Sequence, residues 1–243
     1  MFETNFARIW VYLSASPLLG LTVTLMAYGL AHRLYRSSDQ HPLLNPVLTA
    51  IVLLILFLKG THTSYEAYFE GGQFVQFLLG PATVALAIPL HDQLSKLRKI
   101  WLAVSLTLVA GVVISSWSAI LLVQQLGGSL QTQLSIAPKS VTAPVAMGIS
   151  EKIGGLPSLT AVLVVMTGIF GSVIATQVFA VLRIRDNSAK GIAMGITAHG
   201  LGTARAFQIN AEIGAFSGLG MALSAFTTAL ILPWLLEILK VLP

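Results

Sequence analysis

Long runs of apolar residues, free of Asp, Glu, Lys and Arg, dominate the pattern along the chain. Five such runs cover residues 9–31, 73–91, 100–123, 158–182 and 213–236. Each is near or above the ~20 residues that a helix needs to cross the hydrocarbon core of a bilayer. A shorter run at 43–58 has the same character. The pattern therefore predicts six transmembrane helices, which start at Ile9, Leu43, Gln73, Ile100, Ser158 and Ile213.

The composition requires lipid rather than water around these helices. Of the 243 residues, 55% are hydrophobic and 9% are charged, against roughly 25% charged in an average soluble domain. A soluble fold of this size could not bury so much apolar surface. The first run is longer than the apolar core of a signal peptide and lacks a clear small-residue cleavage site, so we expect a retained helix.

Basic residues follow the apolar runs in three clusters: Arg33 with Arg36, residues 96–99 and residues 183–190. Lys and Arg beside membrane helices favour the cytoplasmic side. This placement explains the formal net charge of +5 better than a nucleic-acid partner does, because the cations form no basic face. We expect a multi-pass protein with all three clusters in the cytoplasm and the N-terminus outside.

Two further apolar segments do not fit a full crossing. If the second and third basic clusters share a side, 100–123 crosses and 158–182 returns, so residues 137–155 must enter and leave on one side. Residues 191–207 carry two cationic or titratable side chains, His199 and Arg205, and within the segment the glycines Gly195, Gly200 and Gly202 lie before or between them. The predicted fold is an all-α polytopic membrane protein with about six full transmembrane helices and two re-entrant or broken helices.

A faint internal repeat fits a single transmembrane domain across residues 1–243. At an offset of 57 residues (138 − 81), residues 80–84 match residues 137–141 in a pattern of small residue, Pro, any residue, hydroxyl residue and Val. Such matches also arise by chance in a sequence this rich in Leu, Val and Gly. A real repeat would give units of about 43–125 and 126–243, and inverted repeats with crossed broken helices occur in many transporters.

Two prolines mark predicted helix starts. Proline is tolerated at the first helical position because its missing N–H would be unpaired there, so we expect helices to begin at Pro81, after Gly80, and at Pro138. At membrane depth, a helix start offers backbone N–H groups and a positive dipole end to an anion. The neighbouring side chains that would add donors are Thr83, Lys139, Ser140 and Thr142.

The alternative is that both prolines mark surface loops, where Lys139 would reach lipid headgroups. For Pro138 the interior site is favoured, because Pro144 and Gly148 also interrupt the helix that follows. For Pro81 the two alternatives stay open.

A second candidate site is the polar, glycine-rich island at residues 199–205. Irregular backbone at membrane depth is tolerated only inside protein or beside water. Arg205 offers a planar charged fork to a carboxylate, and His199 and Thr203 offer hydrogen bonds or, for His199, proton relay. The alternative is an interfacial loop whose arginine contacts lipid phosphate. Glu151 and Glu212 lie near the two irregular segments, where either could pair with a cation or carry a coupling proton.

Enzymatic chemistry is not expected. The sequence contains no G-x-S-x-G, H-E-x-x-H or G-x-x-x-x-G-K-[ST] motif. With no cysteine, a thiolate metal site or a Cys nucleophile is excluded. We expect neither a metal nor another cofactor.

Three separate stretches, residues 79–90, 137–144 and 198–206, resemble the CidB/LrgB family of membrane proteins. The resemblance runs in order over almost the whole chain, although His91 stands where a tyrosine is expected. It implies a bacterial inner-membrane protein of antiholin-like type, which modulates murein hydrolase export and cell lysis. It also implies kinship with plastidial glycolate and glycerate transporters, and a small CidA/LrgA-like membrane partner.

Two hypotheses follow. The first is a secondary transporter of small monocarboxylates or hydroxycarboxylates, such as glycolate, glycerate, lactate or pyruvate. It would be proton-coupled, with Lys139 and Arg205 as counter-charges for the carboxylate. The second is an antiholin-like regulator that acts with a holin-like partner. A homodimer is expected from the frequency of such assemblies alone.

Overall fold

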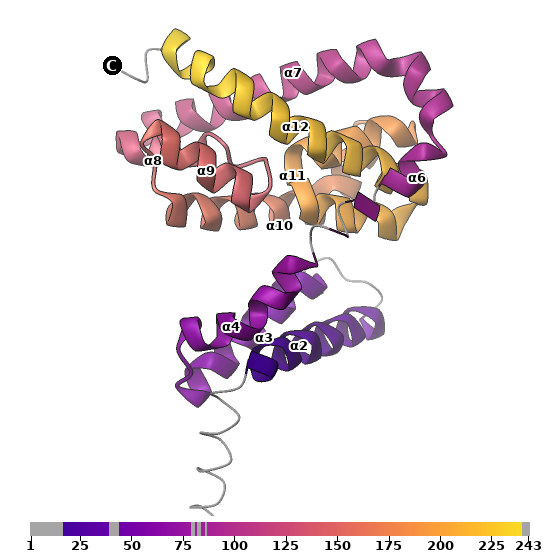
Figure 1. The fold of residues 1–243 in the computed structure, drawn as a ribbon. Helices are drawn as coiled ribbons and strands as arrows, with labels where there is room; N and C mark the ends of the chain where they lie inside the picture. Colours follow the sequence, from indigo (N-terminus) through magenta and orange to yellow (C-terminus); the bar gives the residue numbers. More distant parts are fainter. Residues whose placement is uncertain (1–16, 39–43, 79–80, 82–83, 86, 240–243) are drawn as a thin grey trace, which may run out of the picture. The chain divides into compact units, whose positions relative to one another are not determined.

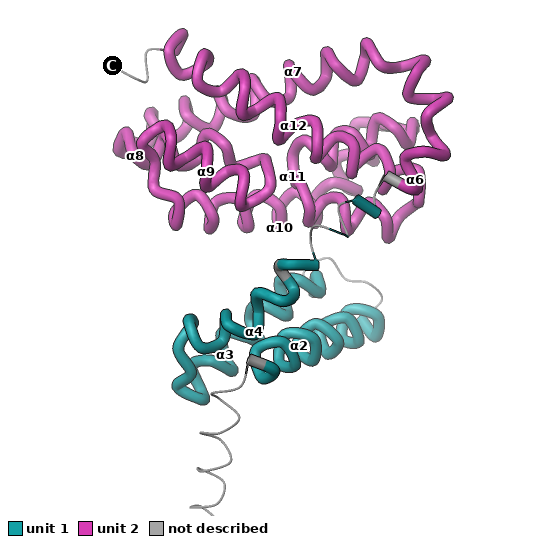
Figure 2. Tube along the Cα trace, in the orientation of Figure 1, with its two compact units in different colours: residues 1–85 teal, residues 86–243 magenta. Residues whose placement is uncertain are grey.

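The computed structural model describes residues 17–38, 44–78, 81, 84–85 and 87–239. Every regular element in these residues is a helix (Figure 1), which confirms the predicted all-α membrane fold. The chain divides into two compact units, residues 1–85 and 86–243, which are described separately below (Figure 2). A single transmembrane domain and its internal repeat stay predictions.

Unit 1 contains three helices in the described residues: α2 (Pro17–Ser37), α3 (Pro46–Thr61) and α4 (Tyr65–Phe77). Helix α3 begins at Pro46 because the Asn45 side chain accepts a hydrogen bond from the backbone N–H of Val47 at 2.9 Å, as an N-cap residue does. Helices α2 and α4 are joined where Thr24 Oγ1 lies 2.8 Å from the Tyr68 hydroxyl. Small alanine side chains pack α2 against α3.

Unit 2 holds the three described helices that are long and apolar enough to cross a membrane: α7 (Leu94–Gln125), α10 (Pro157–Val181) and α12 (Ala211–Ile238). The shortest, α10, has 25 residues and measures ~37 Å, against ~30 Å for the hydrocarbon core. Large apolar side chains such as Trp101, Phe170 and Phe226 are exposed on these helices, as lipid contact requires. Three of the predicted spans are therefore supported.

Two of the other predicted spans are not reproduced, and the first lies partly outside the described residues. The run at 73–91 is not one helix, because α4 ends at Phe77 and α6 (Ala87–His91) is a separate short helix. The run at 43–58 forms α3, which has only 16 residues. Residues 9–16 of the first run lie outside the described residues. Apolar composition alone misses such breaks and short helices.

Helices α8 (Leu130–Ile136) and α9 (Ala143–Ile153) form a helical hairpin. Ser116 Oγ on α7 donates a hydrogen bond to the carbonyl of Ala137 at 2.9 Å. Ser116 lies nine residues (125 − 116) before the end of α7, which is ~14 Å along the helix, so the turn at 137–142 lies deep in the unit. Helix α9 then returns, and the Leu156 N–H before α10 donates to Ser135 Oγ of α8 at 2.8 Å. The hairpin enters and leaves at one end of unit 2, but it begins with α8 at Leu130, so the predicted segment 137–155 contains only the turn and the returning helix α9.

Helix α9 starts later in the chain than the predicted position at Pro138. Pro138 does not begin a helix: it lies in the turn, and Thr142 is the N-cap of α9, with Pro144 in the first turn. Proline suits a first turn and an interhelical turn equally well. The bond from Ser116 to the Ala137 carbonyl holds the chain in the turn at Pro138, so Pro144 starts the helix that it was expected to break.

Helix α11 (Asn187–Ile209) is also a hairpin, broken at His199, whose φ of 40° and ψ of −130° are not helical. A Cβ built on Gly202 would lie 2.7 Å from the carbonyl oxygen of Met194. In a straight helix those two residues would be ~12 Å apart along the axis. The arm after His199 therefore folds back on the arm before it, and the interrupted span predicted at 191–207 is confirmed.

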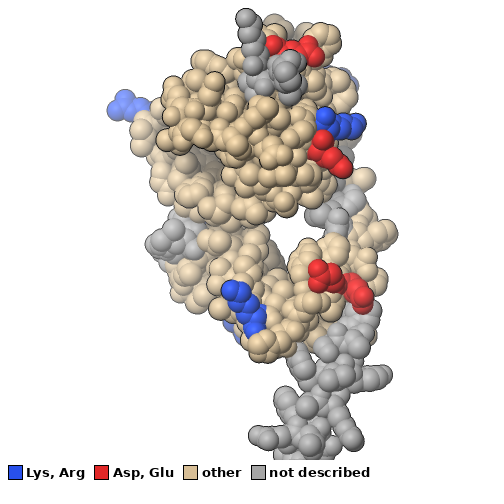
Figure 3. All heavy atoms as spheres, turned by 90° about the vertical axis from the view of Figure 1, so that its left-hand side faces the viewer, with Lys and Arg blue, Asp and Glu red and all other residues tan. Residues whose placement is uncertain are grey.

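The two hairpins occupy opposite ends of unit 2, between the same long helices (Figure 1). The first arm of α11 packs through Ile192 and Ile196 on Val104, Leu108 and Phe216 of α7 and α12. The α8–α9 hairpin shares a buried cluster with the last turns of α12. Figure 3 views the unit from the end that carries α8 and α9, where few charged side chains interrupt the described surface.

An ion cluster marks the other end, where α7, α11 and α12 begin. Lys96 Nζ lies 2.8 Å from Glu212 Oε1 and 3.2 Å from Asp186 Oδ2. The basic clusters at 96–99 and 183–190 thus lie at the same end of unit 2, as predicted. Their cytoplasmic location and an external N-terminus stay predictions.

The contact of α11 with α12 gives a test of this packing. A Cβ at Gly195 would lie against the Ser217 carbonyl oxygen and 2.7 Å from the Met221 backbone nitrogen. Because backbone cannot yield, we expect Gly195→Ala to destabilise the protein by about 1–3 kcal/mol and to lower its thermal midpoint in detergent. Gly148→Ala is the matched control, since nothing lies within 4 Å of its Cβ, and it should leave the midpoint unchanged or raise it. Equal effects of the two variants would contradict the packing described.

The ion cluster gives a pH-dependent test. Hydrogen bonds from the Ser188 hydroxyl and the Ala189 N–H, together with Lys96, lower the pKa of Asp186 from 3.8 to about 2. A depressed carboxyl pKa stabilises the fold above pH ~4, and that contribution is lost as pH falls toward 2. The thermal midpoint of the wild type should fall more steeply between pH 4 and pH 2 than that of Asp186→Asn. Asp92→Asn, at an exposed position, is the control. If the thermal midpoint of Asp186→Asn depends on pH as that of the wild type does, the stabilising contribution of Asp186 is refuted.

Candidate functional site

The tips of the two hairpins meet near the middle of the long helices. The first tip is the turn at residues 137–142, and the second tip is the break at His199 in α11. On α7, Ser116 contacts the first tip. A Cβ built on Gly111, five residues earlier, would lie 3.0 Å from the Ile196 side chain of the second tip. On α10, Val164 belongs to the buried cluster of Val141 in the first tip. The carbonyl of the same Val164 is hydrogen-bonded to His199 of the second tip. Both tips therefore lie within about two helical turns of each other, ~8 Å along α7.

Lys139 supplies the charge at the first tip. Its Nζ donates to Ser115 Oγ at 2.8 Å and to the Ser115 carbonyl at 3.1 Å, and Ser115 Oγ lies 2.8 Å from Ser140 Oγ. These partners are neutral, and among the described residues no carboxylate lies within 4.0 Å of the ammonium. An ammonium has three N–H donors, so one remains for a further acceptor.

His199 holds the second tip. It is 5% exposed, and its Nε2 lies 3.0 Å from the Val164 carbonyl oxygen. A carbonyl only accepts, so Nε2 carries the proton and donates. The carbonyl of His199 accepts from Thr203 Oγ1 at 2.9 Å, and Thr203 Oγ1 lies 2.9 Å from Ser217 Oγ.

Glycine makes the close approach at His199 feasible. A Cβ on Gly168 of α10 would lie 2.8 Å from His199 Nε2 and 2.7 Å from its Cε1. On the next turn, Gly171 faces Ala198 in the same way, with 2.6 Å between the two Cβ positions. The second tip therefore fits α10 only because two glycines stand opposite it.

Arg205 lies away from the two tips. Its guanidinium donates to Gln208 Oε1 at 3.1 Å, and its neighbour Ala206 packs in the buried cluster of Ala175 and Phe179. On the returning arm Arg205 is six residues (205 − 199) beyond His199, ~9 Å along a helix, toward the end of α10 where Ala175 and Phe179 lie. The structure therefore does not bring Arg205 beside Lys139 as two counter-charges of one carboxylate.

The remaining predicted residues divide between the tips and the ends. Thr142 and Pro144 begin α9 at the first tip, while Gly200 and Gly202 follow the break in α11. Glu151 is exposed near the end of α9, and Glu212 is paired with Lys96. Pro81 is helical and belongs to unit 1, and Gly80 and Thr83 lie outside the described residues.

Sequence reasoning missed three hydroxyl residues that hold the tips. Ser115 and Ser116 bind the first tip and Ser217 binds Thr203 of the second. The available signal was the group of three serines, Ser115, Ser116 and Ser118, in the middle of an apolar span. Such residues usually satisfy irregular backbone within a membrane protein.

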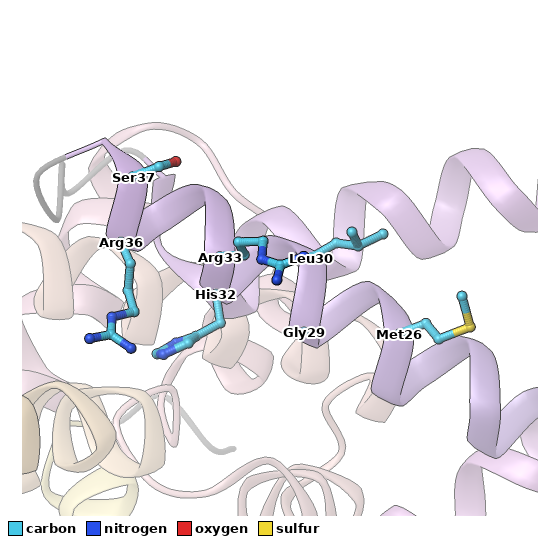
Figure 4. Close-up of a pocket in the computed structure, with 7 residues that line it drawn as sticks. All are labelled: Met26, Gly29, Leu30, His32, Arg33, Arg36 and Ser37. Carbon is cyan, nitrogen blue, oxygen red and sulfur yellow. The ribbon is translucent and has the colours of Figure 1, made fainter.

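Two cavities lie away from the tips. One of about 840 Å³ is lined by a single face of α2 in unit 1, and His32, Arg33 and Arg36 make that face basic (Figure 4). A second, of about 280 Å³, lies beside the ion cluster and includes Lys96 and Asp186. Within the described residues, no group of three or more His, Asp and Glu side chains is arranged to hold a metal ion. The tips thus offer one cation, several hydroxyls and a histidine, which suit a small anion rather than a metal.

Comparison with known proteins places the chain in a family. The LrgB-like family matches residues 24–238. The antiholin-like protein LrgB of Bacillus cereus (strain B4264) is 31% identical over 218 residues, which cover 90% of this chain and 95% of that protein. The antiholin-like protein LrgB of Bacillus anthracis (strain A0248) gives the same figures. No solved structure matches the chain. The chain is therefore a member of the LrgB-like family.

Proposed function

We propose that this chain is an antiholin-like membrane protein, which restrains murein hydrolase export and cell lysis together with a small holin-like partner of the CidA/LrgA type. The supporting observation is that relatives named antiholin-like proteins align with 90% of the chain. The bacterial inner membrane is the proposed location, with the N-terminus outside and a homodimer as the assembly.

A second candidate function is secondary transport of a small monocarboxylate or hydroxycarboxylate, and one observation favours it. Two hairpins enter unit 2 from opposite ends and meet beside Lys139, an ammonium with only neutral partners in the described residues. Transporters often bind substrate at interrupted helices near the membrane midplane. A regulator that needs only a helix face for its partner has no use for this arrangement.

In this mechanism, Lys139 provides the counter-charge for the substrate carboxylate. Ser140 and Thr142 lie on the same tip, and Thr142 precedes the first turn of α9, where backbone N–H groups and the helix dipole favour an anion. His199 and Thr203 of the facing tip would bind the remaining oxygens of the substrate. Arg205 would lie on the path by which the substrate reaches the binding site from the end that carries the ion cluster, and not in the binding site itself.

Proton coupling is part of the same proposal. Glu151 is exposed at one end, and Glu212 at the other end accepts hydrogen bonds from Lys96 at 2.8 Å and Asn187 at 3.0 Å. Each therefore lies at an entrance rather than at the tips. Either could exchange a proton with the solvent on its own side as the substrate passes.

The antiholin-like role can be tested in a strain that lacks this chain. Restoring the wild type should restore the normal timing of lysis, measured by culture turbidity and released hydrolase activity. If the role depends only on partner contact, Lys139→Gln should restore lysis timing as well as the wild type does. If the role depends on solute movement, Lys139→Gln should fail, while Lys152→Gln on the exposed end of α9 should succeed. Wild-type protein that leaves lysis timing unaltered would rule out the proposal.

Transport can be tested with purified protein in liposomes. Labelled glycolate, glycerate, lactate or pyruvate should enter faster than into empty vesicles and saturate with concentration. Lys139→Gln removes the counter-charge, and uptake should fall at least about ten-fold because the substrate carboxylate would be left unpaired in the protein interior. Lys152→Gln should transport normally. Folded wild-type protein that moves none of the four acids would eliminate the transporter.

A further inference from the structure

A third cavity, of about 250 Å³, belongs to unit 2, lies at the end that carries the ion cluster and is separate from the hairpin tips. Its walls are formed mainly by Phe179, Ile184, Ile209 and Ile213, and Lys190 contributes a charged side chain to the lining. These residues come from the end of α10, the segment after it, both arms of α11 and the first turn of α12. The cavity is thus an apolar recess with a cation.

The recess lies at the depth of lipid headgroups if α10 crosses the bilayer. Helix α10 is ~37 Å long, which exceeds the ~30 Å hydrocarbon core, so its last turn reaches the interface. Phe179 is two residues before the end of that helix at Val181. The next residues, Val181 and Leu182, are 80% and 64% exposed, so an apolar outer surface adjoins the recess.

The charge around the recess is positive and is not compensated within the described residues. Lys190 lines it, and Arg183 and Arg185 flank Ile184 in its wall. The ion pairs found in the described parts of the chain join His91 to Asp92 and Lys96 to Asp186 and Glu212. None involves Lys190, which lines the recess, or Arg183 and Arg185, which flank Ile184 in sequence. Asp186, the acidic residue between these cations in sequence, is held by Lys96 and Ser188.

Arg183 also occupies a position that favours glycine. Its φ is 55°, and it follows the α10 C-cap, where the Ile184 N–H donates to the Phe179 carbonyl at 2.9 Å and the Arg183 N–H donates to Ala180 at 3.2 Å. This is the Schellman ending of a helix, in which glycine avoids the strain of a side chain at positive φ. An arginine here costs stability, so the helix ending does not account for its charge.

We propose that this recess binds an anionic phospholipid. Its phosphate would lie between Lys190 and the arginines, and its acyl chains would follow the exposed apolar surface at Val181 and Leu182. An apolar wall with uncompensated cations at interfacial depth is the chemistry that such a lipid requires. The site goes beyond the proposed function and does not depend on it.

Lipid binding can be measured on the purified full chain in detergent by native mass spectrometry with phosphatidylglycerol and phosphatidylcholine that carry identical acyl chains. We expect phosphatidylglycerol to bind more tightly. Lys190→Gln should weaken its binding about five-fold, the effect of removing one interfacial cation. Arg183→Gly should weaken binding similarly, while its thermal midpoint stays equal to or above that of the wild type because the strain at positive φ is relieved.

Lys152→Gln, which removes an exposed cation from the opposite end, is the matched control and should bind phosphatidylglycerol as the wild type does. The proposal is overturned if both lipids bind equally, or if Arg183→Gly folds normally and binds as the wild type. It is also overturned if Lys152→Gln weakens binding as much as Lys190→Gln, because binding would then follow net charge alone.

Discussion

A backbone that stops being helical inside a membrane must have its polar groups satisfied by the protein, because lipid supplies no hydrogen bonds. Unit 2 contains two such breaks, and a hydrogen bond to a facing span holds each of them. The Ala137 carbonyl at the first break accepts from Ser116 of α7, and His199 at the second donates through Nε2 to the Val164 carbonyl of α10. The first break is therefore held at the depth of Ser116 and the second at the depth of Val164.

Small residues then make room for the hairpins among the spans. The first arm of α11 approaches α12 through Gly195 and α10 through the residues that face Gly168 and Gly171. A broken helix at this depth has its tip enclosed by α7, α10 and α12, so side chains on the facing spans must be nearly absent. In unit 2, glycines of the spans such as Gly168 and Gly171 make room for the hairpin tips.

The sequence predicted the spans and the irregular elements better than the contacts of the site. Apolar runs located α7, α10 and α12, and the topology argument required residues 137–155 to turn back. The choice between Pro138 and Pro144 as the helix start depends on a bond from Ser116, which is 22 residues (138 − 116) from Pro138. Local propensity does not contain that information. Arg205 is six residues from His199 in sequence, yet the return of the α11 arm carries it toward the end of α10.

The charge on Lys139 distinguishes between the two proposed functions better than the presence of the hairpins does. Moving an ammonium out of water costs several kcal/mol unless a counter-charge compensates it, and the described residues offer only Ser115 and Ser140 nearby. In a protein whose activity consists of helix contacts with a partner, an apolar residue at position 139 would give a more stable fold. A lysine at the meeting point of two interrupted helices is instead favourable when a transient anion shares the site and compensates its charge. If restraint of lysis responds to the movement of such an anion, the two proposed functions would describe one process at Lys139.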